Sequence, residues 1–138
     1  MRRTAVLAAT MAVLVAALSG AAFAKMVEGD GGDNMLLGTA RADVLEGFGG
    51  NDRLKGFGGD DRLFGGAGGD GLYGGSGDDV LHGGGGADTL NGGPGKDTFY
   101  TAGDGAVDVV DCGGGTDTVK KGEGVRLDRF VNCERFVT

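Results

Sequence analysis

The chain has 138 residues, of which 33 are glycine and none is tryptophan, and it carries 20 acidic side chains against 13 basic ones. Such an acidic balance argues against nucleic acid and anionic membrane surfaces as partners, and it favours cations. Sixteen of the acidic residues are aspartate, a side chain typical of tight turns and calcium loops. Composition alone would suggest disorder, so something besides a conventional hydrophobic core must hold the chain together.

Residues 1–24 have the pattern of a secretory signal peptide. Two arginines precede an apolar run over residues 6–18, and Ala22–Ala24 form an A-x-A cleavage pattern. The alternative, an uncleaved membrane anchor, needs about 20 apolar residues, more than this run provides. We therefore expect a secreted, extracellular chain that begins at Lys25. It retains 11 basic and 20 acidic side chains, a formal net charge of −9, and residues 25–28 form a short N-terminal segment.

From Gly29 to Tyr100 the chain divides into eight tandem nonapeptides, and such internal repetition is the signature of a solenoid. Position one is always glycine, and position eight is leucine in seven repeats and phenylalanine in the last. Position six is Asn34 in the first repeat and aspartate in the others: Asp43, Asp52, Asp61, Asp70, Asp79, Asp88 and Asp97. The pattern resumes in degenerate form over residues 103–120, with Asp108 and Asp117 at position six.

Each position of the repeat has a physical interpretation. Glycine at positions one, two and four indicates a tight loop whose carbonyl groups turn inward. Positions seven to nine form a three-residue strand whose middle side chain points to the opposite face from its neighbours. A loop of six residues and a strand of three, repeated, predict an all-β solenoid of short parallel strands. Two nonapeptides make one coil, with a strand on each side.

Stacking of the coils would place the position-six carboxylates in columns, where like charges repel in a poorly solvated loop. A hard divalent cation removes this repulsion, and calcium suits a flexible cage of oxygen ligands better than magnesium does. The candidate metal-binding residues are therefore the seven position-six aspartates together with the position-four glycines of their loops: Gly50, Gly59, Gly68, Gly77, Gly86 and Gly95.

The phrases GGSGDDVLH, GGGGADTLN and GGPGKDTFY resemble the calcium-binding nonapeptide of RTX, or hemolysin-type, repeat proteins. The resemblance implies a right-handed parallel β-roll that holds several Ca²⁺ ions between successive loops and folds when calcium arrives. Eight repeats would create roughly six inter-loop sites. Arg41 at position four and Asn34 at position six depart from the pattern, so we expect the first two repeats to bind calcium weakly or not at all.

Position five is variable, and three repeats carry a further aspartate there: Asp33, Asp60 and Asp78. These carboxylates either add charge to the calcium loops or face solvent, and we favour the second interpretation.

The two cysteines, Cys112 and Cys133, are expected to form a disulfide because the signal sends the chain to an oxidising compartment. Such a bridge would contribute about 3 kcal/mol to stability. Free thiols and an intermolecular bridge are the alternatives. Residues 121–138 are interpreted as a C-terminal cap with the alternation of an edge strand. The CGGGTDTV and NCERF phrases resemble the end of small secreted calcium-binding proteins of actinobacteria.

The function predicted from these features is calcium-ion binding by a secreted repeat protein, without enzymatic activity. The chain contains no HExxH or GxSxG motif, and its one histidine, His82, occupies an outward strand position. The alternative is a surface spacer or adhesin that calcium stiffens, with outward aromatic residues forming a patch or shielding the roll: Phe48, Phe57, Phe64, Tyr73 and Tyr100. No segment of the mature chain is long and apolar enough for us to expect membrane insertion.

Overall fold

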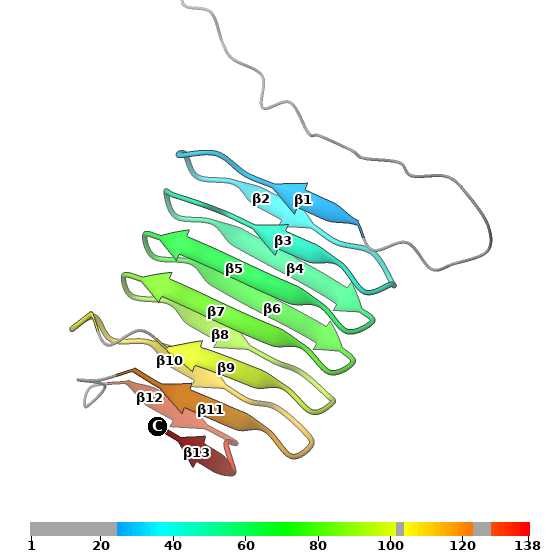
Figure 1. The fold of residues 1–138 in the computed structure, drawn as a ribbon, viewed down its shortest axis with the longest axis vertical. Helices are drawn as coiled ribbons and strands as arrows, with labels where there is room; N and C mark the ends of the chain where they lie inside the picture. Colours follow the sequence, from blue (N-terminus) through cyan, green and yellow to red (C-terminus); the bar gives the residue numbers. More distant parts are fainter. Residues whose placement is uncertain (1–24, 102–103, 123–127) are drawn as a thin grey trace, which may run out of the picture.

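A computed structural model describes residues 25–101, 104–122 and 128–138. The predicted signal peptide, residues 1–24, lies outside the described residues. Figure 1 shows two layers of strands that run across a flat roll like the rungs of two stacked ladders. In the described part of the chain no helix is long and apolar enough to cross a membrane.

Thirteen strands build the roll, and most begin at position seven of a repeat. Their bounds are β1 Met26–Glu28, β2 Met35–Leu37, β3 Val44–Glu46, β4 Arg53–Gly58, β5 Arg62–Ala67, β6 Gly71–Ser76, β7 Val80–Gly85, β8 Thr89–Asn91, β9 Thr98–Thr101, β10 Val109–Asp111, β11 Thr118–Lys121, β12 Arg129–Val131 and β13 Arg135–Val137.

Odd-numbered strands form a seven-stranded sheet and even-numbered strands form a six-stranded sheet. Every strand pair is parallel and in the register of one coil, so that Leu45 lies beside Leu63 and Leu63 beside Leu81. This 18-residue offset confirms the prediction of two nonapeptides per coil. It becomes 20 residues where Phe99 pairs with Val119, because two extra residues follow the last strict repeat.

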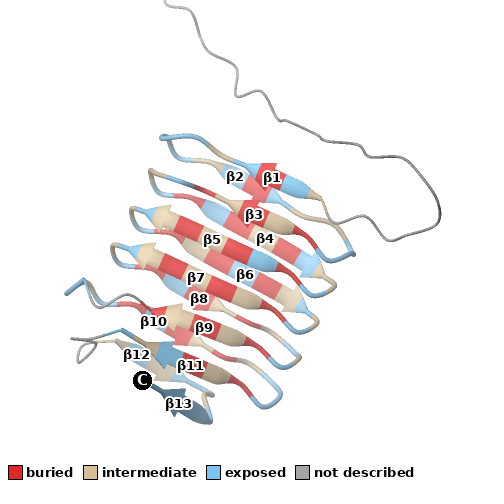
Figure 2. Cartoon of the chain, viewed as in Figure 1, coloured by how far each residue is buried: buried red, intermediate tan, exposed pale blue. Residues whose placement is uncertain are grey.

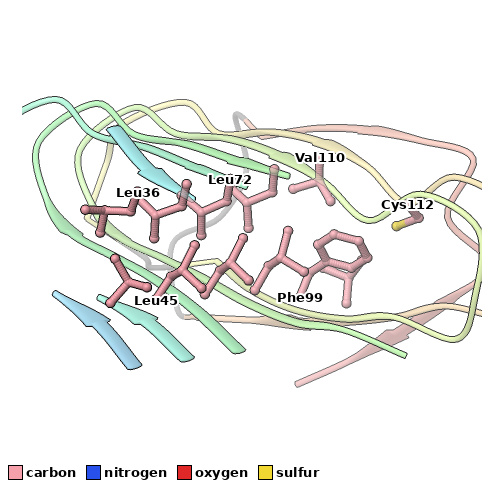
Figure 3. Packing of buried hydrophobic residues seen from close by; sticks show 12 residues of the cluster. Leu36, Leu45, Leu72, Phe99, Val110 and Cys112 are labelled. Carbon is pink, nitrogen blue, oxygen red and sulfur yellow. The ribbon is translucent and has the colours of Figure 1, made fainter. Parts of the chain in front are cut away.

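The core consists of the position-eight side chains, which form one row on the inner face of each sheet. Leu36, Leu72 and Val110 of the six-stranded sheet face Leu45 and Phe99 of the other sheet (Figure 3). All the leucines in this row from repeats two to seven are at most 1 % exposed, and Figure 2 shows the buried band along the strand centres. Burial stabilises the fold by about 1.5–3 kcal/mol for each such side chain, as an upper estimate.

The four central strands are longer than the three residues that the repeat predicts. In β4 to β7 the parallel ladder continues into positions one to three of the next repeat, so that Phe57 pairs with Gly75 and Gly66 with Gly84. Glycine permits this continuation because neighbouring backbones approach closely there: a Cβ on Gly84 would collide with the carbonyl of Gly66. The predicted six-residue loop is therefore shorter in the middle of the roll.

The C-terminal tail supplies the last strand of each sheet. Strand β12 pairs with β10 and β13 pairs with β11, both in parallel, which agrees with the edge-strand character expected of this segment. The predicted disulfide is present, and its Cys112 and Cys133 Cα atoms are 5.1 Å apart. Phe130 and Phe136 pack edge to face with ring centroids 5.2 Å apart. The disulfide thereby joins the tail to the hydrophobic core, to which Cys112 belongs.

Candidate calcium-binding loops

The position-six carboxylates form two columns, one at each loop edge of the roll. Each of the seven predicted aspartates is at most 3 % exposed, although each carries an ionisable group. The N–H of Asp43 donates to Oδ1 of Asp61 at 2.8 Å, and the N–H of Asp61 donates to Oδ1 of Asp79 at 2.8 Å. The same bond joins Asp79 to Asp97, Asn34 to Asp52, Asp52 to Asp70 and Asp70 to Asp88. The columns expected from the repeat are therefore present.

Both columns continue beyond the strict repeats. Asp88 donates to Asp108 at 2.9 Å and Asp97 donates to Asp117 at 2.7 Å. The bonds then run from Asp108 to Asp128 and from Asp117 to Glu134, both at 3.0 Å. The sequence analysis missed Asp128 and Glu134 because the period of nine is broken before them. The signal that identifies them is an acidic residue placed directly before a short strand, in the phrases DRFV and ERFV.

The second carboxylate oxygen of these aspartates is the unusual feature of the loops. Oδ2 is buried and accepts no hydrogen bond from any described residue in nine of them: Asp52, Asp61, Asp70, Asp79, Asp88, Asp97, Asp108, Asp117 and Asp128. A buried acceptor without a partner costs about 1–3 kcal/mol, and more when it is charged. A cation is the usual partner for buried carboxylates that have no donor.

Asp43 differs from the other position-six aspartates. Its Oδ2 already accepts hydrogen bonds from Thr39, from the N–H at 2.5 Å and from the hydroxyl at 2.8 Å. Asn34 is likewise satisfied locally, since its Oδ1 accepts the N–H of Asp30 at 2.8 Å. These contacts give a structural reason for the prediction that the first two repeats bind calcium weakly or not at all.

In the strict repeats a position-one glycine lies directly beside the unpartnered oxygen, at a point where no side chain would fit. A Cβ placed on Gly65 would lie 2.6 Å from Asp70 Oδ2 and 2.6 Å from the carbonyl oxygen of Gly83 in the next coil. A carboxylate oxygen of one loop and a carbonyl oxygen of the next therefore face the same space. Carboxylate and carbonyl oxygens are the ligands that calcium prefers, so the residues present fit this ion.

The position-four glycines shape the loops in the way the sequence predicts. All six adopt positive φ, between 86° for Gly59 and 135° for Gly95, a region that glycine occupies without steric cost. Their participation as calcium ligands stays a prediction. Within the described ranges no three His, Cys, Asp or Glu side chains gather around one point.

Burial makes the bare carboxylates costly. Burial, with a smaller contribution from the neighbouring carboxylates of the columns, raises the pKa of Asp88 to about 8 and those of Asp61 and Asp97 to about 7. For Asp70 and Asp79 burial is again the main cause, and the pKa rises to about 6. Negative charge in the columns is therefore unfavourable unless a counter-charge is bound.

The position-five aspartates face solvent, as we favoured, and they also bond to the next coil. Asp33 accepts the N–H of Asn51 at 2.7 Å, and Asp60 accepts the N–H of Asp78 at 2.8 Å. Asp78 in turn accepts the N–H of Lys96 at 2.9 Å. The sequence analysis missed these bonds, which join successive coils outside the buried columns.

His82 lies on the outer face of the seven-stranded sheet, at the outward position expected. Its ring stacks between Phe64 and Tyr100, with centroid distances of 4.8 Å and 4.0 Å. The Lys120 ammonium group lies 4.8 Å from the Tyr100 ring centroid and donates to the Tyr100 hydroxyl at 2.9 Å. Burial and the Lys120 charge lower the pKa of His82. These contacts describe an aromatic ladder along the sheet.

Comparison with protein families assigns the repeat. The family model of the RTX calcium-binding nonapeptide repeat (4 copies) matches residues 28–56, 37–72 and 73–105, which together include every strict repeat. No curated protein matches the chain. The matched segments contain the aspartate columns as far as Asp88 and Asp97, with their glycine loops. The chain therefore belongs to the RTX calcium-binding nonapeptide repeat family, and its β-roll binds several Ca²⁺ ions.

Proposed function

We propose that this protein is secreted, that it folds when calcium binds between its loops, and that it acts without enzymatic chemistry. The observation that carries the proposal is the pair of columns of buried aspartates whose Oδ2 atoms have no hydrogen-bond donor among the described residues. Without a cation these oxygens destabilise the roll, whereas a bound calcium ion would turn each of them into a ligand.

The magnitudes support coupling between binding and folding. Extracellular calcium modules commonly have dissociation constants of about 10⁻⁴–10⁻³ M. A ligand at tenfold its dissociation constant stabilises the folded form by about 1.4 kcal/mol for each site. With roughly six sites the total would be about 8 kcal/mol, comparable to the whole stability of a typical domain of 5–15 kcal/mol. Calcium would then decide whether the chain is folded.

Secretion is proposed from the pattern of residues 1–24 and is compatible with the disulfide, since disulfides persist in oxidising compartments. The unfolded chain would leave a cell in which free calcium is scarce and would fold outside. Expression of the full chain in a secreting host, followed by N-terminal sequencing of the medium fraction, tests this step. We expect a mature chain that begins at Lys25. Finding the whole chain in the cell fraction, with residues 1–24 still attached, would contradict secretion.

The ligand residues are proposed to be the position-six aspartates and the loop carbonyls that surround them. Isothermal titration calorimetry of the chain with calcium tests this assignment. We expect several ions for each chain and much weaker binding of magnesium, which requires a stricter octahedral geometry. Binding of a single ion, or equal affinity for the two metals, would contradict the proposal.

A further inference from the structure

A groove on the outer face of the six-stranded sheet runs from Arg53, next to Asp52, to the glycine-loop residues Phe57 and Gly75. It has a volume of about 570 Å³ and is lined by Arg53, Lys55, Phe57, Tyr73 and Gly75. Strand β4 presents Arg53, Lys55 and Phe57 outward in alternation with buried residues. In the register of the sheet, Lys55 lies beside Tyr73 and Phe57 lies beside Gly75. Because Gly75 has no side chain, the space beside the Phe57 ring stays open.

Phe57 holds a backbone conformation that its side chain disfavours. Its φ is 78° and its side chain is 53 % exposed. The four repeats that follow have glycine at this position, namely Gly66, Gly75, Gly84 and Gly93, with φ between 89° and 97°. The roll therefore accepts glycine here. Strained backbone at a bulky, exposed residue persists mainly where function requires the side chain. Phe48 shares this conformation, so Phe57 is the candidate for ligand contact because its ring also lines the groove.

The groove also differs from the rest of the molecule in charge. Arg53 and Lys55 place two cations on one strand of a chain whose acidic residues outnumber its basic ones. The Lys55 ammonium group lies 5.8 Å from the centroid of the Tyr73 ring, so cation and aromatic face are adjacent. Arginine pairs readily with carboxylate groups, and exposed aromatic rings bury flat apolar surfaces. The groove therefore suits an anionic ligand that contains rings.

The shape of the groove favours a polymer over a small molecule. It lies open on the face of a sheet, and solvent-exposed ion pairs are individually weak, so useful affinity needs several contacts along one ligand. The net negative charge of the chain would repel the dense phosphates of nucleic acid more strongly than a sparsely charged glycan. We propose that the groove binds an acidic glycan, with sugar rings on Phe57 and Tyr73 and carboxylates on Arg53 and Lys55.

Two residues outside the groove offer matched controls for Phe57 and Arg53. Phe48 has the same position in its repeat, a φ of 72° and 47 % exposure, but it does not line this groove. Arg62 begins β5 in the seven-stranded sheet as Arg53 begins β4 in the six-stranded sheet. Phe48→Gly and Arg62→Gln therefore repeat the chemistry of Phe57→Gly and Arg53→Gln outside the proposed site.

The experiment is calorimetric titration of the full chain in millimolar calcium with a hyaluronan hexasaccharide, which carries a carboxylate on every second ring. We expect the hexasaccharide to bind, with an affinity that falls as salt is added. We expect Phe57→Gly to lower this affinity by roughly five- to tenfold. Arg53→Gln should also weaken it, whereas Phe48→Gly and Arg62→Gln should leave it unchanged. Circular dichroism of each variant checks the fold, and Phe57→Gly should fold because glycine is native at this position in later repeats.

Several results would overturn the glycan site. The hexasaccharide could fail to bind a folded chain, or its carboxyl-reduced form could bind equally well. Single-stranded DNA could bind more tightly than the hexasaccharide, or the groove variants and the control variants could have equal effects. The circular dichroism record separates this inference from the proposed function. A chain that folds without calcium but binds the glycan would contradict the proposed function only. A chain that folds with calcium but does not bind the glycan would contradict the groove assignment only.

Discussion

At the scale of single residues, the two oxygens of each position-six aspartate have different roles. Oδ1 accepts a backbone N–H from the coil before, as Asp79 does from Asp61 at 2.8 Å, and so holds the stack together. Except in Asp43, Oδ2 is buried without a donor among the described residues, and in the strict repeats it lies beside a position-one glycine. One side chain therefore joins the coils and is proposed to bind the ion, which explains why aspartate recurs at this position.

Replacing Asp79 by asparagine separates these two roles. The amide oxygen can still accept the Asp61 N–H, but the charge that would bind calcium is lost. We expect Asp79→Asn to raise the calcium concentration at the folding midpoint several-fold, since the affected sites lose a charged ligand. Circular dichroism during calcium titration measures this midpoint.

The neighbouring Asp78→Asn is the matched control, because it removes the same charge from an exposed carboxylate. Its midpoint should move much less. Equal midpoints for the two variants would show that position six contributes only general negative charge, and would contradict the ligand assignment.

The raised pKa values of the columns predict the pH dependence of the calcium-free chain. The pKa of Asp88 is about 8 in the folded form against an ordinary value of 3.8, so the folded form binds more protons than the unfolded form between these limits. Stability without calcium must therefore rise as the pH falls from about 8 towards 4. In chelator, the β-signal in far-ultraviolet circular dichroism should therefore be larger at pH 5 than at pH 8.

Calcium reverses this trend, because protons compete with the ion for the same oxygens. We expect the calcium concentration at the folding midpoint to increase as the pH falls from 8 to 5. A calcium-free β-signal that falls on acidification would show that these carboxylates are stabilised in their charged form by something other than the metal.

At the scale of loops and strands, the period of nine predicted most of the architecture. Strand positions, the buried row from Leu36 to Phe99 and the two carboxylate columns all follow from it, because each coil meets a copy of itself 18 residues later. Where the spacing changes, the pattern is less informative. Asp128 and Glu134 join the columns at offsets of 20 and 17 residues, which no strict repeat predicts.

Two other features could not be predicted because they depend on contacts between coils. The ladder of β4 to β7 extends into the glycine loops by pairs such as Phe57 with Gly75 and Gly66 with Gly84, which the repeat itself does not specify. The position-five bonds, such as Asp60 to the N–H of Asp78, require the exact height of the stacked loops. A one-dimensional pattern identifies which residues recur, but it does not show which polar atoms come within bonding distance.

The position-one glycines make a prediction at the scale of the loop. Gly65→Ala would place a Cβ 2.6 Å from both Asp70 Oδ2 and the Gly83 carbonyl oxygen, in the space proposed for the ion. We expect weaker calcium binding and a loss of about 1–3 kcal/mol in the free energy of unfolding, because the loop must shift. Calcium titration and denaturant unfolding measure the two effects.

Gly49→Ala is the control for this change. A Cβ on Gly49 would meet its nearest neighbour at 3.6 Å, an ordinary van der Waals contact. It should change calcium affinity little. If both alanine variants bind calcium like the native chain, the space beside Asp70 is not a calcium site.

At the scale of the whole molecule, the roll is a one-dimensional stack in which each coil contacts only its neighbours. The apolar row is a single side chain wide on each sheet, and the carboxylate columns run on both sides of it. In such a stack, stability is close to a sum over coils and their interfaces. An ion bound between two coils orders both of them for the next ion, so calcium binding and folding should be cooperative.

The most direct test of this account is far-ultraviolet circular dichroism of residues 25–138 during titration with calcium, with magnesium as the matched control. The account predicts a cooperative rise in β-signal between sub-millimolar and millimolar calcium, reversed by chelator and absent with magnesium. A spectrum that is the same in chelator and in millimolar calcium would contradict it, because the buried aspartate columns would then be tolerated without the ion, or never formed.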